Sequence, residues 1–201
     1  MHKTFISYHH DNEQDLKNEI IKKYGNESFI DKSVSDGDID PDCDEEYIMK
    51  LIREDYLEDT TVTVVLIGKE TSQRPFVNSE IQASLWGDNF NGLVGVIRDD
   101  IYSEIFGESV CNYSGCGCNQ KLRSIISRGY NQLLPYLVRE NHKKDDVVYH
   151  YDDTEIFCSL VKYSDFFKNP EYYINQAFDK RGSMEPARKR NSSDTPAIRK
   201  E

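Results

Sequence analysis

The segment 61–85 constrains the fold more than any other part of the chain. Its first part, 61–67, is an apolar run rich in β-branched residues, which is typical of a strand buried on both faces of a parallel sheet. A short polar turn follows, and residues 75–85 then form a helical pattern that starts with proline, a residue suited to the first helical turn. A strand that passes through a short turn into a helix is the repeating unit of α/β folds.

The rest of the chain continues this alternation. Strand patterns occur at 3–7, 28–31, 61–67, 92–97 and 157–162, and helix patterns at 13–24, 44–56, 75–85 and 170–180. Such alternation implies parallel strands joined by crossover helices. We therefore predict an α/β fold, a flavodoxin-like three-layer sandwich with a mainly parallel central sheet. Residues 99–120 are expected to form a long loop, and residues 121–139 mix helix and strand patterns.

Length and charge limit the organisation of the chain and its partners. The 201 residues suit one domain, which we place at 1–180, with core motifs in 3–97 and a divergent C-terminal half. Residues 181–201 are basic and poor in large apolar residues, and we predict a disordered tail there. The net charge of −11 argues against a general nucleic-acid surface. No apolar run approaches the roughly 18–20 residues of a membrane span, and the first residues lack the apolar core of a signal peptide. We expect a cytoplasmic protein that binds neither nucleic acid nor a membrane.

Glu80 is the one carboxylate in the predicted helix 75–85, and it lies four residues after Phe76 on the same helical face. In open α/β sheets, ligands bind beyond the carboxyl ends of the strands, which is where this helix begins. An acid in an early helical turn also interacts favourably with the helix dipole and is often only solvated surface. Position alone therefore leaves both a binding role and a surface role open for Glu80.

Several short motifs, taken in order along the chain, resemble the TIR domain. The first strand ends in FISY at 5–8, and the second strand carries FID at 29–31. More closely, TVVLIG at 63–68, ET at 70–71 and RPFVNSEI at 74–81 resemble the TIR-like family of the signalling protein of the Thoeris anti-phage system. The resemblance covers roughly residues 3–97, about half of the chain.

Catalytic TIR domains cleave NAD⁺, release nicotinamide and form ADP-ribose or a cyclic isomer of it. The resemblance therefore implies an NAD⁺-consuming enzyme in bacterial anti-phage defence, with NAD⁺ as substrate, no bound cofactor, and a product that activates a separate effector protein. The family's catalytic glutamate falls on Glu80, and its nucleotide-facing residues fall on Phe5, Ser7 and Tyr8. Phe76 stands where the family commonly has tryptophan, so an aromatic platform remains but the indole N–H is lost.

The loop after the second predicted strand contains Asp31, Ser33 and Asp36. TIR proteins have a mobile loop here that often gates the site or contacts the next protomer, so the resemblance implies substrate-binding roles for these residues. The resemblance also leaves two kinds of partner open. One is a second copy of the chain, which would form a homo-oligomer with a composite site, and the other is a phage-derived trigger. A solvated polar loop is the alternative interpretation of the same residues.

One carboxylate can suffice for the implied chemistry. Glycosidases normally use two, one of which protonates the leaving group. Nicotinamide leaves as a neutral molecule from a cationic precursor and needs no general acid. A single acid such as Glu80 can then accept hydrogen bonds from the ribose diol and stabilise the developing positive charge.

Two other classes of function compete with the enzyme. The first is a non-catalytic TIR-like scaffold that acts through protein–protein assembly. This hypothesis stays open because Phe76 replaces the family's tryptophan. The second is a receiver-like phosphate switch. Such a protein needs clustered acids and a lysine at a strand end, and the sequence shows neither; it also has no glycine-rich phosphate loop. The enzyme is the leading hypothesis.

Five cysteines are scattered along the chain, an odd number that argues for thiols rather than a disulfide framework. Cys111, Cys116 and Cys118 are closely spaced and could form a three-thiolate zinc site with a fourth ligand such as histidine. Structural zinc sites usually use two separated pairs of ligands, and this run does not provide them. We therefore expect no metal and a flexible loop of thiols.

Overall fold

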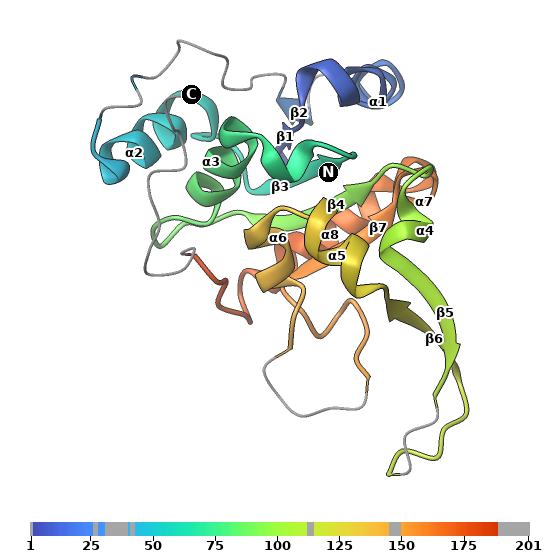
Figure 1. Cartoon of the computed structure of the whole chain (residues 1–201). Helices are drawn as coiled ribbons and strands as arrows, with labels where there is room; N and C mark the ends of the chain where they lie inside the picture. The colour runs from blue at the N-terminus through green and yellow to red at the C-terminus, as the bar shows by residue number, and fades with distance from the viewer. Residues whose placement is uncertain are drawn as a thin grey trace.

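The structure is a computed structural model. It describes residues 2–25, 28–30, 40, 43–111, 115–144 and 150–188. Within these ranges a central parallel sheet lies between two layers of helices (Figure 1). The predicted fold class, a flavodoxin-like three-layer α/β sandwich, is confirmed.

Five parallel strands form the central sheet, in the order β2-β1-β3-β4-β7. Their bounds are β1 Thr4–Ser7, β2 Phe29–Ile30, β3 Val62–Ile67, β4 Gly92–Ile97 and β7 Cys158–Lys162. β1 and β3 pair with each other at the middle of this order. From β1 the chain adds β2 on one side, and from β3 it adds β4 and then β7 on the other. In flavodoxin-like sheets this topological switch point is where ligands bind, at the carboxyl ends of the strands.

Helices cover both faces of the sheet. One face carries α1 His10–Tyr24, α7 Tyr163–Lys168 and α8 Pro170–Lys180. The other carries α2 Glu45–Tyr56, α3 Pro75–Ser84, α5 Ser127–Leu133 and α6 Tyr136–Asn141. A short 3-10 turn, η1 Thr71–Gln73, lies between β3 and α3. Among the helices described, none combines the length and the apolar character needed to cross a membrane.

The elements predicted in the first half of the chain are confirmed, with ends that shift by a few residues. The late strand and the terminal helix are confirmed as well. These segments were predictable because the sheet is buried on both faces: every residue of β3 and of β4 is buried, so both strands are dense in apolar residues.

The prediction of a loop over 99–120 was wrong in part. A one-turn helix, α4 Tyr102–Ile105, leads into β5 Phe106–Val110, which pairs antiparallel with β6 Lys121–Ile125. This hairpin extends away from the central sheet (Figure 1). Its strands are largely exposed, so they carry no apolar run that would distinguish them from a loop in the sequence.

The first residues after α8 pack against the domain. The backbone N–H of Ala187 donates to Oδ1 of Asn141, and Asn141 Nδ2 donates back to the Ala187 carbonyl, at 2.9 and 3.0 Å. The side chain of Arg181 donates to the carbonyl of Phe90 at 2.6 Å. The packed part of the chain therefore extends through residue 188, beyond the predicted boundary at 180. The remainder of the predicted tail, 189–201, lies outside the described residues.

Candidate functional site

A buried hydrogen bond joins the switch point of the sheet to α3. The hydroxyl of Ser7, the last residue of β1, donates to Oε2 of Glu80 at 2.6 Å. Ser7 is fully buried and Glu80 is 1% exposed. Successive strand residues face opposite sides of a sheet, so Ser7 and Phe5 both face α3, whereas Ile6 packs on the α1 side. The surface role considered for Glu80 is therefore excluded.

Polar contacts at the other end of α3 fix the helix against the sheet. The hydroxyls of Thr63 on β3 and Ser84 on α3 are 2.7 Å apart, and Ser84 also donates to the backbone carbonyl of Glu80 at 2.8 Å. Asn91 donates to the Thr63 hydroxyl at 3.1 Å. Because buried polar groups that are hydrogen-bonded specify one arrangement, this network sets where the Glu80 side chain is presented.

The other predicted site residues are not all brought to Glu80. Phe5 lies in the core between the sheet and α2, and Phe76 is half-buried against the same cluster. Tyr8 packs on the opposite face of the sheet, where its hydroxyl donates to Gln14 at 3.0 Å. Substrate contacts by Phe5, Tyr8 and Phe76 remain predictions. Asp31, Ser33 and Asp36 lie outside the described residues.

A second buried carboxylate lies at the same edge of the sheet and was missed from the sequence. Glu13, in the first turn of α1, is fully buried. Its Oε2 accepts a hydrogen bond from the Thr71 hydroxyl at 3.1 Å, and Thr71 accepts one from the backbone N–H of Gly68, just beyond β3, at 2.8 Å. Burial raises the pKa of Glu13 to about 7, against the lowering effects of the Thr71 hydrogen bond and the charge of Arg98.

The sequence contained a signal for this burial. Glu13 precedes Leu16 by three residues and Ile20 by seven, so it continues the apolar stripe by which α1 packs on the sheet. Gly68 makes room for the carboxylate, because a Cβ atom there would fall on Oε1 of Glu13. An acid on the buried stripe of a helix, opposite a strand-end glycine, could have been singled out from the sequence.

Three buried polar atoms near this edge have no hydrogen-bond partner among the residues described: Oε1 of Glu13, Nδ1 of His9 and Nε of Arg74. His9 follows β1 and is 9% exposed, whereas its neighbour His10 is exposed. Burial lowers the pKa of His9, and the nearby charge of Arg74 lowers it further. Because unpaired buried polar atoms are rare in folded proteins, their concentration makes this edge of the sheet a candidate site for a polar ligand.

The raised pKa of Glu13 predicts a pH-dependent stability. Between pH 4.5 and about 7 the folded state binds a proton at Glu13 that the unfolded chain does not, so the free energy of unfolding should fall as pH rises through this window. In Glu13→Gln the difference between pH 5 and pH 8 should shrink by about 1–2 kcal/mol relative to wild type. Urea unfolding of both proteins at the two pH values measures it, and equal pH dependence in both would contradict the burial of an ionisable Glu13.

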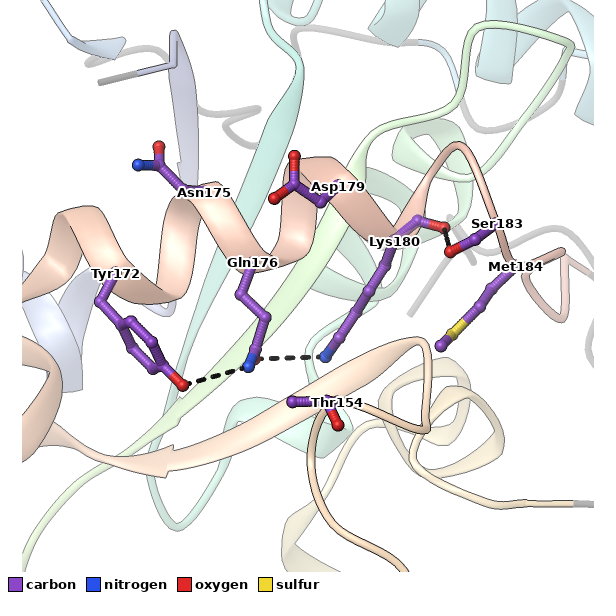
Figure 2. Close-up of a pocket in the computed structure, with 8 residues that line it drawn as sticks. All are labelled: Thr154, Tyr172, Asn175, Gln176, Asp179, Lys180, Ser183 and Met184. Carbon is purple, nitrogen blue, oxygen red and sulfur yellow. Dashed lines mark hydrogen bonds between the residues drawn. The ribbon is translucent and has the colours of Figure 1, made fainter.

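A separate hollow of about 430 Å³ lies along α8. Figure 2 shows Gln176 and Lys180 reaching from the helix toward Thr154. The Lys180 ammonium, 4% exposed, donates to the Asp153 carbonyl and to the hydroxyl of Ser159 at 2.7 Å. These partners flank the amino end of β7, the edge opposite to the ligand-binding one. Lys180 therefore ties α8 to β7, and its ammonium is engaged in these structural contacts.

Residues 5–100 match the family model described as Thoeris protein ThsB, TIR-like domain. The match includes Ser7, Glu80, Glu13 and Gly68 and ends three residues after β4. It confirms the family suggested by the motifs of the first half of the chain. No curated protein matches the sequence.

Proposed function

We propose that this protein is an enzyme that cleaves NAD⁺, because residues 5–100 match the TIR-like family of the Thoeris anti-phage defence system. Its product would be nicotinamide together with a messenger derived from ADP-ribose, in its cyclic form. The messenger would activate a separate effector protein within the cell that makes it. NAD⁺ is the substrate in this scheme, and the protein needs no resident cofactor.

The observation that carries the proposal is the buried pair of Ser7 and Glu80. The pair joins the carboxyl end of β1 to α3, at the β1/β3 switch point. Keeping an ionisable side chain away from water is costly unless it is hydrogen-bonded. A carboxylate placed and oriented there suits a reaction in which positive charge develops on a bound ligand.

The proposed reaction breaks one bond of the substrate. The bond between ribose C1′ and the pyridinium nitrogen breaks, and both electrons go to nicotinamide, which leaves neutral. The ribose becomes cationic, and the Glu80 carboxylate stabilises this charge while the Ser7 hydroxyl holds one of its oxygens. Water can then add at C1′ with loss of a proton to give ADP-ribose. Attack by a nucleophile of the same molecule gives the cyclic product instead.

The unpaired atoms at the sheet edge supply further contacts for a dinucleotide. Once the packing around them opens, Nε of Arg74 and Nδ1 of His9 could donate to phosphate oxygens, His9 in the tautomer that carries its proton on Nδ1. Glu13, with its pKa raised to about 7, can accept a proton near neutral pH. These residues extend the proposed site from Glu80 across the switch point.

The burial of Glu80 favours an enzyme that is silent at rest. At 1% exposure its carboxylate cannot touch a ribose until the packing around it opens. A phage-derived trigger or assembly into an oligomer could provide that opening. The same burial also favours a second candidate, a non-catalytic TIR-like scaffold in which Glu80 only holds α3 to β1.

Incubation of the purified chain with NAD⁺ and chromatography of the products test the proposal. The reaction is run with protein alone and with lysate of phage-infected cells, beside lysate alone. Nicotinamide released in equal amount to an ADP-ribose derivative, above the lysate background, is the expected result. Unchanged NAD⁺ under both conditions would contradict the enzyme and leave the scaffold as the proposed function.

Ser7→Ala should weaken both the fold and the proposed reaction. Loss of the hydroxyl leaves a buried carboxylate oxygen without its 2.6 Å donor, which costs about 1–3 kcal/mol of stability. Ser79→Ala is the matched control, because Ser79, on α3, is likewise buried, and among the residues described its hydroxyl donates to the backbone carbonyl of Pro75. Urea unfolding and nicotinamide release are measured for both. An equal loss of stability in the two variants would show that Ser7 has no special partner.

A further inference from the structure

The tip of the β5–β6 hairpin collects four side chains that can bind a metal. Sulfur atoms of Cys111, Cys116 and Cys118 and a ring nitrogen of His150 all lie within 4.8 Å of one another. Nε2 of His150 is 3.3 Å from Cys116 Sγ and 3.5 Å from Cys118 Sγ. None of these cysteines forms a disulfide. The fourth ligand that the cysteine run lacks is therefore supplied from 32 residues further along the chain.

The hairpin explains how the three thiols meet. Val110 pairs with Lys121 at the end of the ladder, and the N–H of Cys111 donates to the Gln120 carbonyl at 2.9 Å, which extends the ladder by one step. Cys111 is thereby placed beside the strand that returns from Cys118. Gly117, between the other two cysteines, has φ +65°, a backbone conformation that glycine adopts without strain. This turn lets two cysteines separated by one residue point to the same place.

We propose that Cys111, Cys116, Cys118 and His150 bind one zinc ion. Zinc–sulfur and zinc–nitrogen bonds of about 2.3 and 2.0 Å in a tetrahedron place ligand atoms about 3.5–3.8 Å apart. The separations at His150 are close to this spacing, and the 4.8 Å bound on the others requires only a small contraction. Three thiolates favour zinc over hard cations such as Mg²⁺ or Ca²⁺.

The binding step is balanced by proton release. Each thiol loses its S–H proton as its sulfur binds Zn²⁺, and neutral His150 donates the lone pair of Nε2, so up to three protons are released and nothing is oxidised or reduced. The filled site carries a net charge of −1. Four protein ligands leave no open position, which is characteristic of a structural rather than a catalytic zinc site.

The zinc would fasten the hairpin to the segment that leads into β7. A second contact already joins these parts: Arg123 on β6 pairs with Asp153 at 2.6 Å and donates to the carbonyl of Leu160 on β7 at 2.7 Å. His150 lies three residues before Asp153, so the proposed ion and the Arg123 contacts act on the same segment. The ion would thus stabilise the connection between an exposed hairpin and the edge strand of the sheet.

Metal content of the full-length chain tests the proposal independently of NAD⁺ cleavage. Protein purified under reducing conditions without chelators, then dialysed, should contain one zinc per chain by mass spectrometry. Cys118→Ser and His150→Ala should each retain less than about a tenth of it, because loss of one ligand of four weakens binding strongly. Cys43→Ser and His10→Ala are the matched controls and should keep the full amount, because both residues lie outside the cluster.

Cobalt substitution covers the case in which a variant fails to fold. Wild-type protein loaded with Co²⁺ should show two signals: the intense visible absorption of tetrahedral cobalt and a thiolate-to-cobalt charge-transfer band. Added zinc should displace the cobalt and remove both. Three results would overturn the proposal. The first is reduced wild-type protein that retains no zinc and gives no tetrahedral cobalt spectrum. The second is a disulfide between Cys116 and Cys118 in freshly isolated protein. The third is an equal loss of zinc in Cys43→Ser and Cys118→Ser.

Discussion

Glu80→Gln is expected to lower the rate of nicotinamide release by about 100- to 1,000-fold, the loss typical when a preorganised electrostatic contact to the transition state is removed. Glutamine has nearly the same shape and can still accept the Ser7 hydrogen bond through its amide oxygen. It carries no negative charge, so it cannot stabilise a cationic ribose. The rate of nicotinamide release, compared at saturating NAD⁺, measures the effect on the chemical step.

The matched control is Glu54→Gln. Glu54 is an exposed helical acid on α2, 3.7 Å from Lys50, and its neutralisation should leave the rate unchanged. Thermal unfolding of both variants separates loss of chemistry from loss of fold. Equal activity of wild type and Glu80→Gln would remove Glu80 from the proposed mechanism, whatever the fate of the scaffold alternative.

Gly92→Ala is expected to destabilise the protein by about 3 kcal/mol, the upper part of the range for overpacking a well-packed interior. Gly92 is the first residue of β4 and lies directly under α8. A Cβ atom there would fall on the carbonyl oxygen of Ala177, far inside contact distance, and would stand 3.1 Å from the backbone nitrogen of Phe178. Backbone atoms cannot rotate away as a side chain can, so the helix would have to move off the sheet.

Gly182→Ala provides the comparison for this substitution. Its added Cβ would have only an ordinary contact, 3.6 Å from the carbonyl of Asp179, so the stability should stay within about 0.5 kcal/mol of wild type. Urea unfolding of the three proteins measures the difference. A Gly92→Ala variant as stable as Gly182→Ala would mean that α8 does not approach the sheet as closely as the structure shows.

The central fold could be predicted because strands that are buried on both faces consist almost entirely of apolar residues. Such runs occur in β3 and β4, α3 has an apolar stripe, and the alternation of strand and helix implies parallel pairing. Ser7 and Glu80 could be selected from the motifs. Their mutual hydrogen bond could not, since it depends on the pairing of β1 with β3 and on the position of α3 above them.

The rest of the site was less accessible to sequence reasoning. Tyr8 follows Ser7, and neighbouring strand residues face opposite sides of the sheet, so the motif cannot place both beside Glu80. His9 has the residue type of solvated surface, and only packing shows that it is buried, whereas the apolar stripe of α1 points to Glu13 in the sequence.

The second half of the chain shows a different limit. An exposed hairpin leaves no apolar pattern, and a metal ligand such as His150 is identified only after the hairpin has set the positions of the cysteines. The cysteine run offers three ligands without two separated pairs, so the sequence alone predicts no metal there. Three-dimensional proximity supplies the missing ligand, which spacing along the chain could not specify.

The pairing of β4 with β7 has a consequence for how the protein is made. Ile97 and its partner Lys162 are separated by 65 residues, and the helix α8 that covers β3 and β4 comes later still. Chains emerge from the ribosome at about 5–20 residues per second, so the first four strands are synthesised several seconds before their last neighbours exist. During that interval β4 has an open edge and an uncovered apolar face, and a chaperone that shields apolar strands would find its binding site there.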